Sequence, residues 1–252
     1  MNGKKESYLL NVSTTNLNVA KTHDFSIQYS NLALDYNKNY MVALISYSMY
    51  YSWYNIFSGI NNKFSYSPDS GANYFNIFLT EGNYGISDIN TEIKRLITAN
   101  NHNADNINIT GNFTTLKVDI TLANNYYVDM GLSDGLNKIL GFSSQILSTQ
   151  GINAGDLKPN VSNDVDAITI HSSLVDFKSN LLNDNYSTCL HQFVPKASVG
   201  SNLSDEISAP VYLPLSVSGK VNTIYFSIRD QNNNLLDLND ESVVLSLNIK
   251  EV

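Results

Sequence analysis

The stretch YMVALISYSMYY, residues 40–51, is the part of the sequence that most strongly indicates the fold class. It is a long apolar and aromatic run, too rich in strand-forming residues to be a loop. Shorter segments before it carry the same signal. Residues 7–12 predict a short opening strand, and in residues 24–30 every second side chain is apolar, namely Phe25, Ile27 and Tyr29. The first fifty residues therefore predict extended strands.

Further along the chain, the two-residue period returns in several segments separated by turn residues. It is clearest near the end, where residues 222–229 and 242–250 flank the turn residues 230–234 and predict a hairpin. Other strands are expected at residues 63–67, 73–80, 113–122, 165–175 and 211–217. Pro214 lies within the last of these and indicates an edge strand, because proline cannot donate to a neighbouring strand.

Helical spacing occurs only in the middle of the chain. One short helix is expected after Ser87, which is placed to cap it, and a second after Ser133, ending at Gly141. Residues 99–106, 143–164 and 178–208 are expected to be loops. The fold class predicted is all-β, an antiparallel β-sandwich, with both helices in an insertion over residues 81–164 of a single domain spanning 1–252. Residues 1–20 are interpreted as an N-terminal arm.

Composition limits the classes of function. The net charge is -8 and only 15% of the residues are charged. Lysine and arginine cluster only at Lys4-Lys5 and Lys94-Arg95, so we expect no direct nucleic-acid binding by the folded body. The polar start and the absence of a long apolar run predict synthesis and assembly inside a cell, with no signal peptide and no membrane partner.

The sequence carries no recognisable catalytic or metal-binding pattern, so we expect no enzyme activity, no metal and no cofactor. Nucleotide-binding, zinc-protease and nucleophile-elbow motifs are absent, and the four histidines are scattered. Cys189 lies two residues from His191 without further ligands nearby. Four acidic residues around the last turn form a solvated turn more readily than a calcium site; they are Asp230, Asp237, Asp240 and Glu241.

A run of aromatic residues leaves two interpretations open: a sugar-stacking platform, or a core and subunit contact. The run consists of Tyr47, Tyr50, Tyr51, Trp53 and Tyr54. We favour core or interface, because the apolar residues 41–45 lead directly into it.

Several short motifs, in a fixed order, carry a family likeness. They are VALIS at 42–46, SWYNI at 52–56, NKF at 62–64, Tyr84-x-Ile86, LGF at 140–142, APVYLPL at 209–215 and IYFSIRD at 224–230. Together they resemble the penton (vertex, minor capsid) proteins of Polinton/Maverick-like viruses and virophages, from about Tyr40 to Val252. The turn at 231–234 departs from the pattern because it lacks the expected glycine, although asparagine tolerates the same backbone.

This resemblance implies a single jelly roll that assembles as a homopentamer at the five-fold vertices of an icosahedral virion, beside double-jelly-roll major capsid proteins. It also suggests core or subunit-interface residues, which are Trp53, Tyr54, Asn55, Ile56, Phe64, Phe142, Tyr212, Pro214 and Phe226. Two other classes of function remain open from the residues alone. One is a β-sandwich carbohydrate-binding or host-attachment module, and the other is a non-viral β-sandwich scaffold.

Overall fold

The computed structural model describes residues 5–15, 21–182 and 184–252. Residues 1–4 and 16–20, which include Lys4 and belong to the expected N-terminal arm, therefore lie outside the described residues. The chain divides into two compact units, one made of Met1–Trp53 and Val165–Val252, and the other of Tyr54–Asp164. Each unit is described below by itself.

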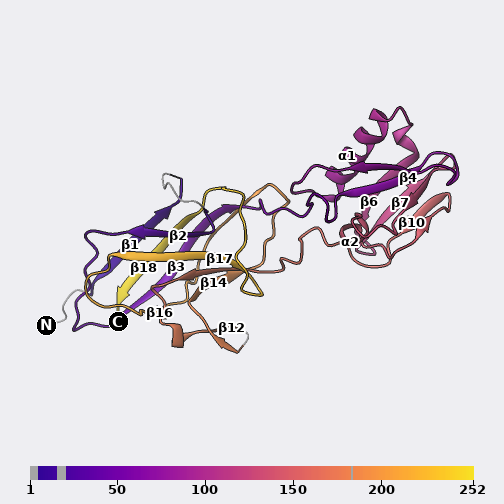
Figure 1. Ribbon diagram of the computed structural model, residues 1–252. Helices are drawn as coiled ribbons and strands as arrows, with labels where there is room; N and C mark the ends of the chain where they lie inside the picture. The colour runs from indigo at the N-terminus through magenta and orange to yellow at the C-terminus, as the bar shows by residue number, and fades with distance from the viewer. Residues whose placement is uncertain (1–4, 16–20, 183) are drawn as a thin grey trace. The chain divides into compact units, whose positions relative to one another are not determined.

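The first unit consists of two main antiparallel sheets (Figure 1). One sheet has the order β1 (Ser7–Ser13), β18 (Val244–Glu251), β3 (Tyr40–Tyr50) and β15 (Asn202–Glu206), with β16 (Leu213–Pro214) also paired to β3. The other has the order β14 (Cys189–Phe193), β11 (Ile168–Ser172), β17 (Thr223–Asp230) and β2 (Asp24–Gln28). Consecutive strands repeatedly switch from one sheet to the other, which is the strand order of a jelly roll. The predicted all-β fold of jelly-roll type is confirmed.

The core of this unit lies between the two sheets, where the alternating apolar residues meet. Leu245, Leu247 and Ile249 of β18 are fully buried, and Phe226 of β17 stacks on Phe25 of β2 with ring centroids 5.4 Å apart. The opposite side of each strand carries polar residues, because successive side chains of a strand point to opposite faces. The two-residue period in the sequence therefore identified the buried face correctly.

The predicted hairpin at the end of the sequence is wrong. β17 pairs with β2 and β11, whereas β18 pairs with β1 and β3 in the other sheet. The segment 231–243 thus crosses from one sheet to the other. Alternation specifies which side chains are buried but not which strands are neighbours, so two strands of a sandwich and two strands of a hairpin look the same in sequence.

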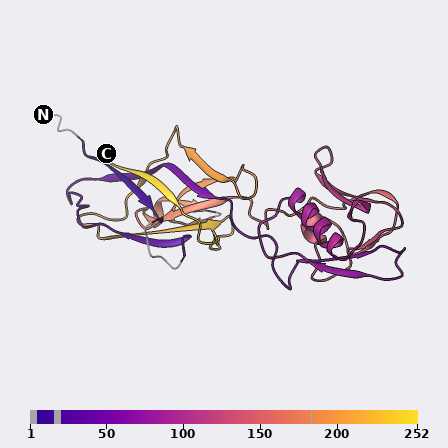
Figure 2. The same cartoon turned by 90° about the horizontal axis from the view of Figure 1, so that it is seen from above.

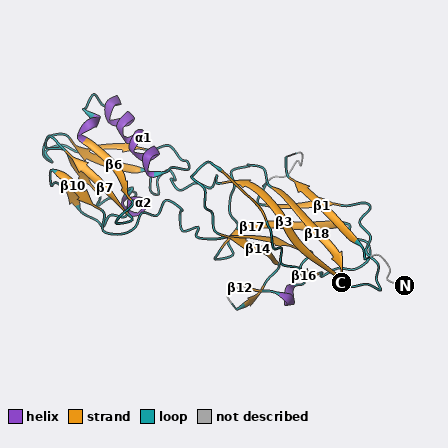
Figure 3. Cartoon of the chain, turned by 180° about the vertical axis from the view of Figure 1, so that it is seen from behind, coloured by secondary structure: helices purple, strands orange, loops and turns teal. Residues whose placement is uncertain are grey.

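The second unit has its own two small sheets and its own hydrophobic core. One sheet has the order β5 (Phe75–Phe78), β4 (Lys63–Ser67), β8 (Tyr127–Asp129) and β9 (Ile146–Leu147). The other has the order β10 (Gly151–Ala154), β7 (Lys117–Leu122) and β6 (Ile107–Asn112). Helix α1 (Ile86–Ala99) packs against β6 and β5 through Ile89, Ile93 and Ile97 (Figures 2 and 3).

This unit begins at Tyr54, earlier than the insertion expected over 81–164. The difference arises because the buried side chains of β4 and β5, among them Phe64 and Ile77, belong to the same core as the helices. Residues 1–20 were expected to form an N-terminal arm, but Ser7–Ser13 within them form β1, which pairs with β18 in the first unit. The second compact unit is therefore inserted into the sequence of the jelly roll, between residues 53 and 165.

Both helices lie in the second unit, but neither starts as predicted. Gly85, not Ser87, precedes the first turn of α1, and the Asp88 carboxylate accepts a hydrogen bond from the Gly85 backbone N–H at 2.9 Å. Helix α2 (Asn137–Leu140) follows Leu136 and is not capped by Ser133. Its predicted end at Gly141 is confirmed: φ there is 77°, and a Cβ would meet the Leu157 carbonyl group.

Three segments expected to be loops contain ordered elements. Residues 99–106 end in a short 3₁₀ helix, η1 (Ala104–Asn106), and residues 143–164 hold β9 and β10. Residues 178–208 hold β12 (Leu181–Leu182), β13 (Asn185–Tyr186), β14 and β15, preceded by η2 (Phe177–Ser179). These strands are short or lie at sheet edges, so their alternation is weak or mostly polar.

Candidate assembly surfaces and the predicted site residues

Trp53 lies in the core of the jelly-roll unit, just after β3. Its side chain is 3% exposed, and its ring stacks on Tyr51 with centroids 3.9 Å apart and an angle of 18° between the planes. The apolar strand that precedes Trp53 directs the aromatic run inward. This arrangement leaves no exposed Trp53 face for a sugar to stack on.

Asn55 is the central hydrogen-bonding residue of the second unit and is fully buried. Its side-chain amide donates to the carbonyl groups of Tyr84 and Val161, at 2.7 and 2.9 Å, and its Oδ1 accepts from the Tyr84 N–H at 2.9 Å. The Asn163 side chain donates to the Tyr54 carbonyl oxygen nearby. These bonds hold the first and last residues of the unit side by side.

The remaining predicted residues divide between core and surface. Ile56, Phe64 and Phe142 are buried in the second unit, and Phe226 is buried in the jelly roll, whereas Tyr54 is half-buried. Tyr212 and Pro214 lie at the surface of the jelly-roll unit beside β3 and β18. The Tyr212 hydroxyl donates to Asn248 at 3.0 Å, and the Lys250 ammonium lies 3.4 Å from the centre of the Tyr212 ring. The residues of the sequence motifs therefore lie in three different environments: the core of the jelly roll, the core of the second unit, and exposed or half-exposed positions.

The solvent-facing side of the sheet β1–β18–β3–β15 carries several hydroxyl and amide groups that bond across the strands, together with the exposed side chains of Leu9 and Glu206. Ser246 donates to Asn11, Asn248 donates to Ser7, and Asn202 donates to Ser48, at 2.9 to 3.1 Å. The hydroxyl and amide groups of this face can form hydrogen bonds with water or with another protein surface. It is one candidate surface for association.

The free edges of the two sheets form a second candidate surface. β14 and β15 each have one strand neighbour, and a groove of about 690 Å³ lies between them. Tyr47 and Phe193 stack along it with centroids 4.2 Å apart. Burial, followed by the nearby Asp205 carboxylate, raises the pKa of Tyr47 to about 12. Apolar and polar side chains both line this groove, with Lys196 and Asp205 among them, and unpaired strand edges of this kind are typical of places where another chain adds on.

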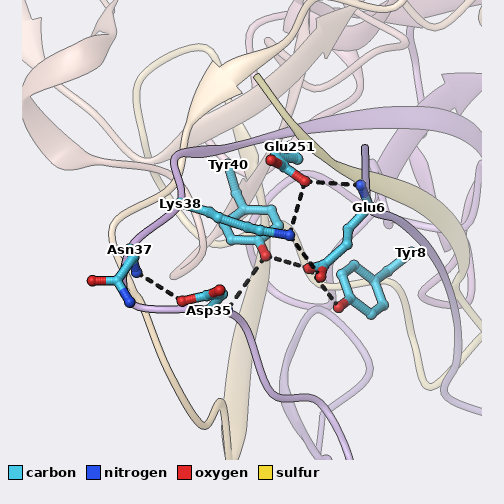
Figure 4. Close-up of polar contacts among 7 residues, drawn as sticks. All are labelled: Glu6, Tyr8, Asp35, Asn37, Lys38, Tyr40 and Glu251. Carbon is cyan, nitrogen blue, oxygen red and sulfur yellow. Dashed lines mark hydrogen bonds and ion pairs between the residues drawn. The ribbon is translucent and has the colours of Figure 1, made fainter. Parts of the chain in front are cut away.

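A cluster of charged and phenolic groups joins the start of β1 to the end of β18 (Figure 4). The Lys38 ammonium lies 2.8 Å from Glu6 and 3.2 Å from Glu251, and the hydroxyl groups of Tyr40 and Tyr8 donate to Glu6 at 2.5 and 3.1 Å. Hydrogen bonds from Lys38, Tyr40 and Tyr8 lower the pKa of Glu6 to about 2. Sequence reasoning missed this cluster because no short motif contains residues so far apart.

No catalytic arrangement is visible in the parts of the chain that the structure describes. The Cys189 thiol is buried, which raises its pKa to about 11, and it contacts the backbone carbonyl of His191 and not the imidazole. Among the described residues, no three His, Cys, Asp or Glu side chains come together as metal ligands. Asp230 instead accepts hydrogen bonds from the backbone of Asn232 and Asn234, as a turn residue does. No helix within the described ranges is long and apolar enough to cross a membrane.

The strand order, the core between the sheets and the second unit define an all-β protein of jelly-roll type with an additional β-rich unit. No family model and no curated protein matches the sequence. The structure is similar to the crystal structure of the selenomethionine-labelled mavirus penton protein, with a TM-score of 0.50 and 14% sequence identity, and the match covers 98% of this chain and 100% of that one. The resemblance indicated by the sequence motifs is thus confirmed at the level of the fold.

Proposed function

We propose that this chain is a minor capsid protein that forms the pentameric vertex of an icosahedral virus or virus-like particle. The observation that carries the proposal is the extent of the structural likeness to a penton protein, which spans both chains almost from end to end. A shared jelly roll alone supports little about function, because many unrelated proteins use that fold. A likeness that continues through the second unit is more specific.

The proposed assembly is a closed ring of identical subunits, which requires two different surface patches that fit each other. In this proposal, one of the two patches is the edge formed by β14 and β15, which lies within residues 178–208. Val194 on this edge is 57% exposed and lines the groove. The partners in the particle are neighbouring copies and a double-jelly-roll major capsid protein, the location is the virion, and assembly takes place in the host cell.

Multi-angle light scattering after size-exclusion chromatography and native mass spectrometry test the ring directly. We expect five copies per particle, either alone or with the major capsid protein, and density for the chain at the five-fold vertices in electron cryomicroscopy. Val194→Asp places a charge in the groove and should reduce the fraction of pentamer at least tenfold. The control Ile60→Asp changes a residue of the second unit that is 66% exposed and should leave assembly intact.

A chain that remains monomeric at all concentrations and is absent from the vertices would overturn the proposal. The alternative of a carbohydrate-binding or host-attachment module would then be favoured. It is tested by measuring binding to a glycan array with and without EDTA. The non-viral scaffold predicts neither vertex density nor glycan binding.

A further inference from the structure

The turn that joins β6 to β7 carries apolar side chains into solvent. The two strands pair from Ile107 with Leu122 to Asn112 with Lys117, so residues 113–116 form the turn, and these four residues are the hairpin tip. Phe113 is 93% exposed, Leu116 is 55% exposed, and the two threonines between them are exposed as well. Within the described ranges, no residue of the hairpin tip forms a hydrogen bond or ion pair with a residue outside the hairpin. The side chains of Phe113 and Leu116 therefore contribute little buried area to the second unit.

Leu116 holds a backbone conformation that leucine rarely adopts. Its φ is 56°, in the left-handed region where glycine, asparagine and aspartate are favoured. Eleven non-glycine residues have a positive φ in the described part of the chain; nine of them are Asn or Asp, and only Leu116 is apolar. An asparagine would form the same turn at a lower cost, so the turn itself does not explain the leucine. A backbone outlier of this kind motivates a functional explanation.

The hairpin tip is held in shape by Asn112. The Asn112 Oδ1 accepts hydrogen bonds from the backbone N–H groups of Thr114 and Thr115, at 3.1 and 3.2 Å. Its side-chain amide donates to the Asp119 carboxylate at 2.9 Å. Backbone N–H groups without partners are costly where water is scarce, and two of those at the tip are satisfied within the hairpin. The tip is therefore preorganised for contact with an apolar medium.

The hairpin tip lies in an uncharged part of the sequence, since residues 107–116 contain no Asp, Glu, Lys, Arg or His. The nearest charged residues are Lys117, which is half-buried at the base of the tip, and Asp119, whose carboxylate is bonded to Asn112. The chain as a whole carries a net charge of -8, which opposes adsorption on an anionic surface. The tip is therefore suited to a neutral surface that takes up apolar groups.

The small size of the hairpin tip indicates the kind of partner. A stable protein interface buries about 800 Å² on each partner, whereas one buried aromatic side chain supplies only about 150–250 Å². Phe113 and Leu116 together fall well short of a protein interface. A lipid surface needs no complementary pocket, and aromatic side chains are enriched at the level of the lipid headgroups.

We infer that the hairpin tip, residues 113–116, is a contact site for the surface of a neutral phospholipid bilayer, into which Phe113 and Leu116 insert. The expectation of no membrane partner rested on the absence of a long apolar run, and a peripheral contact of two side chains does not need one. The contact goes beyond a vertex role and does not depend on it. Several copies on one particle would raise the avidity for the bilayer.

Tryptophan fluorescence of the variant Phe113→Trp, made in the full chain, tests the insertion. Trp53 is buried and supplies a background that the wild-type spectrum corrects for. With phosphatidylcholine vesicles, we expect the emission of the tryptophan at position 113 to shift to the blue and to be quenched by dibrominated phosphatidylcholine. Vesicles that also contain phosphatidylserine should bind no more strongly, because the protein is acidic.

Vesicle flotation compares the wild type with a variant that lacks both apolar side chains. Phe113→Ser combined with Leu116→Gly should lower the partition coefficient by roughly tenfold or more, and glycine suits the positive φ at position 116. The matched control is Ile152→Ser. Ile152 is 69% exposed and pairs with Thr121 of β7, away from the tip, so the control should bind vesicles like the wild type.

The absence of a blue shift, equal flotation of the wild type and the tip variant, or stronger binding to the anionic vesicles would each overturn the inference. A tip variant that loses oligomers while the wild type ignores vesicles would also overturn it, and would assign the tip to a protein contact. Circular dichroism establishes that each variant retains the fold. The oligomeric state of the wild type is measured without lipid, so failure of the lipid contact is distinguishable from failure of the vertex proposal.

Discussion

Asn55 shows how one buried polar side chain stabilises a whole unit. Its buried amide forms hydrogen bonds with two carbonyl groups and one N–H group of partly buried residues. Removing a hydrogen-bonding side chain leaves those groups unpaired, and each unpaired buried group costs about 1–3 kcal/mol. The asparagine in the sequence motif is therefore best explained by folding, not by chemistry at a site.

We expect Asn55→Ala to destabilise the protein by about 2–4 kcal/mol, because several buried hydrogen bonds are lost together. Urea unfolding followed by circular dichroism measures the change. Asn76→Ala is the matched control, since Asn76 is exposed on β5 of the same unit, and it should change the free energy of unfolding by less than about 0.5 kcal/mol. Equal effects of the two variants would contradict the role assigned to Asn55.

His171 is the residue through which acid should weaken the jelly-roll unit. It is 6% exposed, and its ring nitrogens lie 3.0 Å from the Thr169 hydroxyl and 3.4 Å from the Thr188 hydroxyl. Burial, and secondarily the positive charge of Arg229, lower the pKa of His171 to about 4. The folded protein therefore resists protonation of this ring more strongly than the unfolded chain does.

This difference predicts a loss of stability as the pH falls from about 6.5 to 4, since the unfolded state binds the proton first in that interval. Above pH 6.5 the ring is neutral in both states and contributes no pH dependence. The slope of the unfolding free energy against pH should be smaller in His171→Gln than in the wild type. His102→Gln, on the second unit, serves as the control, and identical slopes in the wild type and His171→Gln would contradict the assignment.

At the scale of elements, the sequence was most informative where alternation was strong. The strands around Ile120 and Leu247 were predictable because one face of each is apolar and the other polar, and the strand around Leu44 was predictable because its long run of strand-forming residues is unlike a loop. β6, β10, β14 and β15 were not, because they are short or polar and lie beside turns. The pairing of strands could not be predicted either, because the crossing of residues 231–243 from one sheet to the other depends on tertiary contacts.

The candidate site residues follow the same rule. Trp53 was interpreted as buried because an apolar strand leads into it, and the structure places it in the core. The cluster of Glu6, Lys38 and Glu251 had no local signal, because the three residues meet only when the first and last strands pair. The sequence therefore predicted whether a side chain is buried much better than it predicted which distant residues are in contact.

The second unit is expected to fold without the jelly roll. It has its own core of buried residues, and the Asn163 side chain reaches the Tyr54 carbonyl oxygen at 3.3 Å, so both ends of the unit lie together. A fragment of residues 54–164 should unfold cooperatively in urea with dispersed amide resonances. In the reciprocal variant, a short Gly-Ser linker joining residues 53 and 165 should leave a folded jelly roll. A fragment without cooperative unfolding would contradict the autonomy of the unit.

At the scale of the whole molecule, charge opposes association of like copies. Each chain carries a net charge of -8, so the proposed pentamer would accumulate the negative charge of five copies around one axis. Repulsion between exposed charges is screened beyond roughly 8–10 Å at physiological salt. We expect the pentamer fraction in native mass spectrometry and light scattering to rise between about 10 and 150 mM NaCl. A pentamer that dissociates over this interval would show that ion pairs, not neutral contacts, hold the subunits together.

The pairing of β1 with β18 has a consequence for how the chain reaches its native state on the ribosome. Ser7 pairs with Lys250, so β1 has no β18 partner until the ribosome has made the whole stretch that separates the two strands. Contacts between residues so distant along the chain form slowly, and an unpaired strand edge is prone to wrong pairing while it waits. Residues 54–164, by contrast, are complete long before β18 emerges. Translation should therefore yield a nascent chain in which the middle folds first, and the jelly roll closes only once β18 is available to pair with β1.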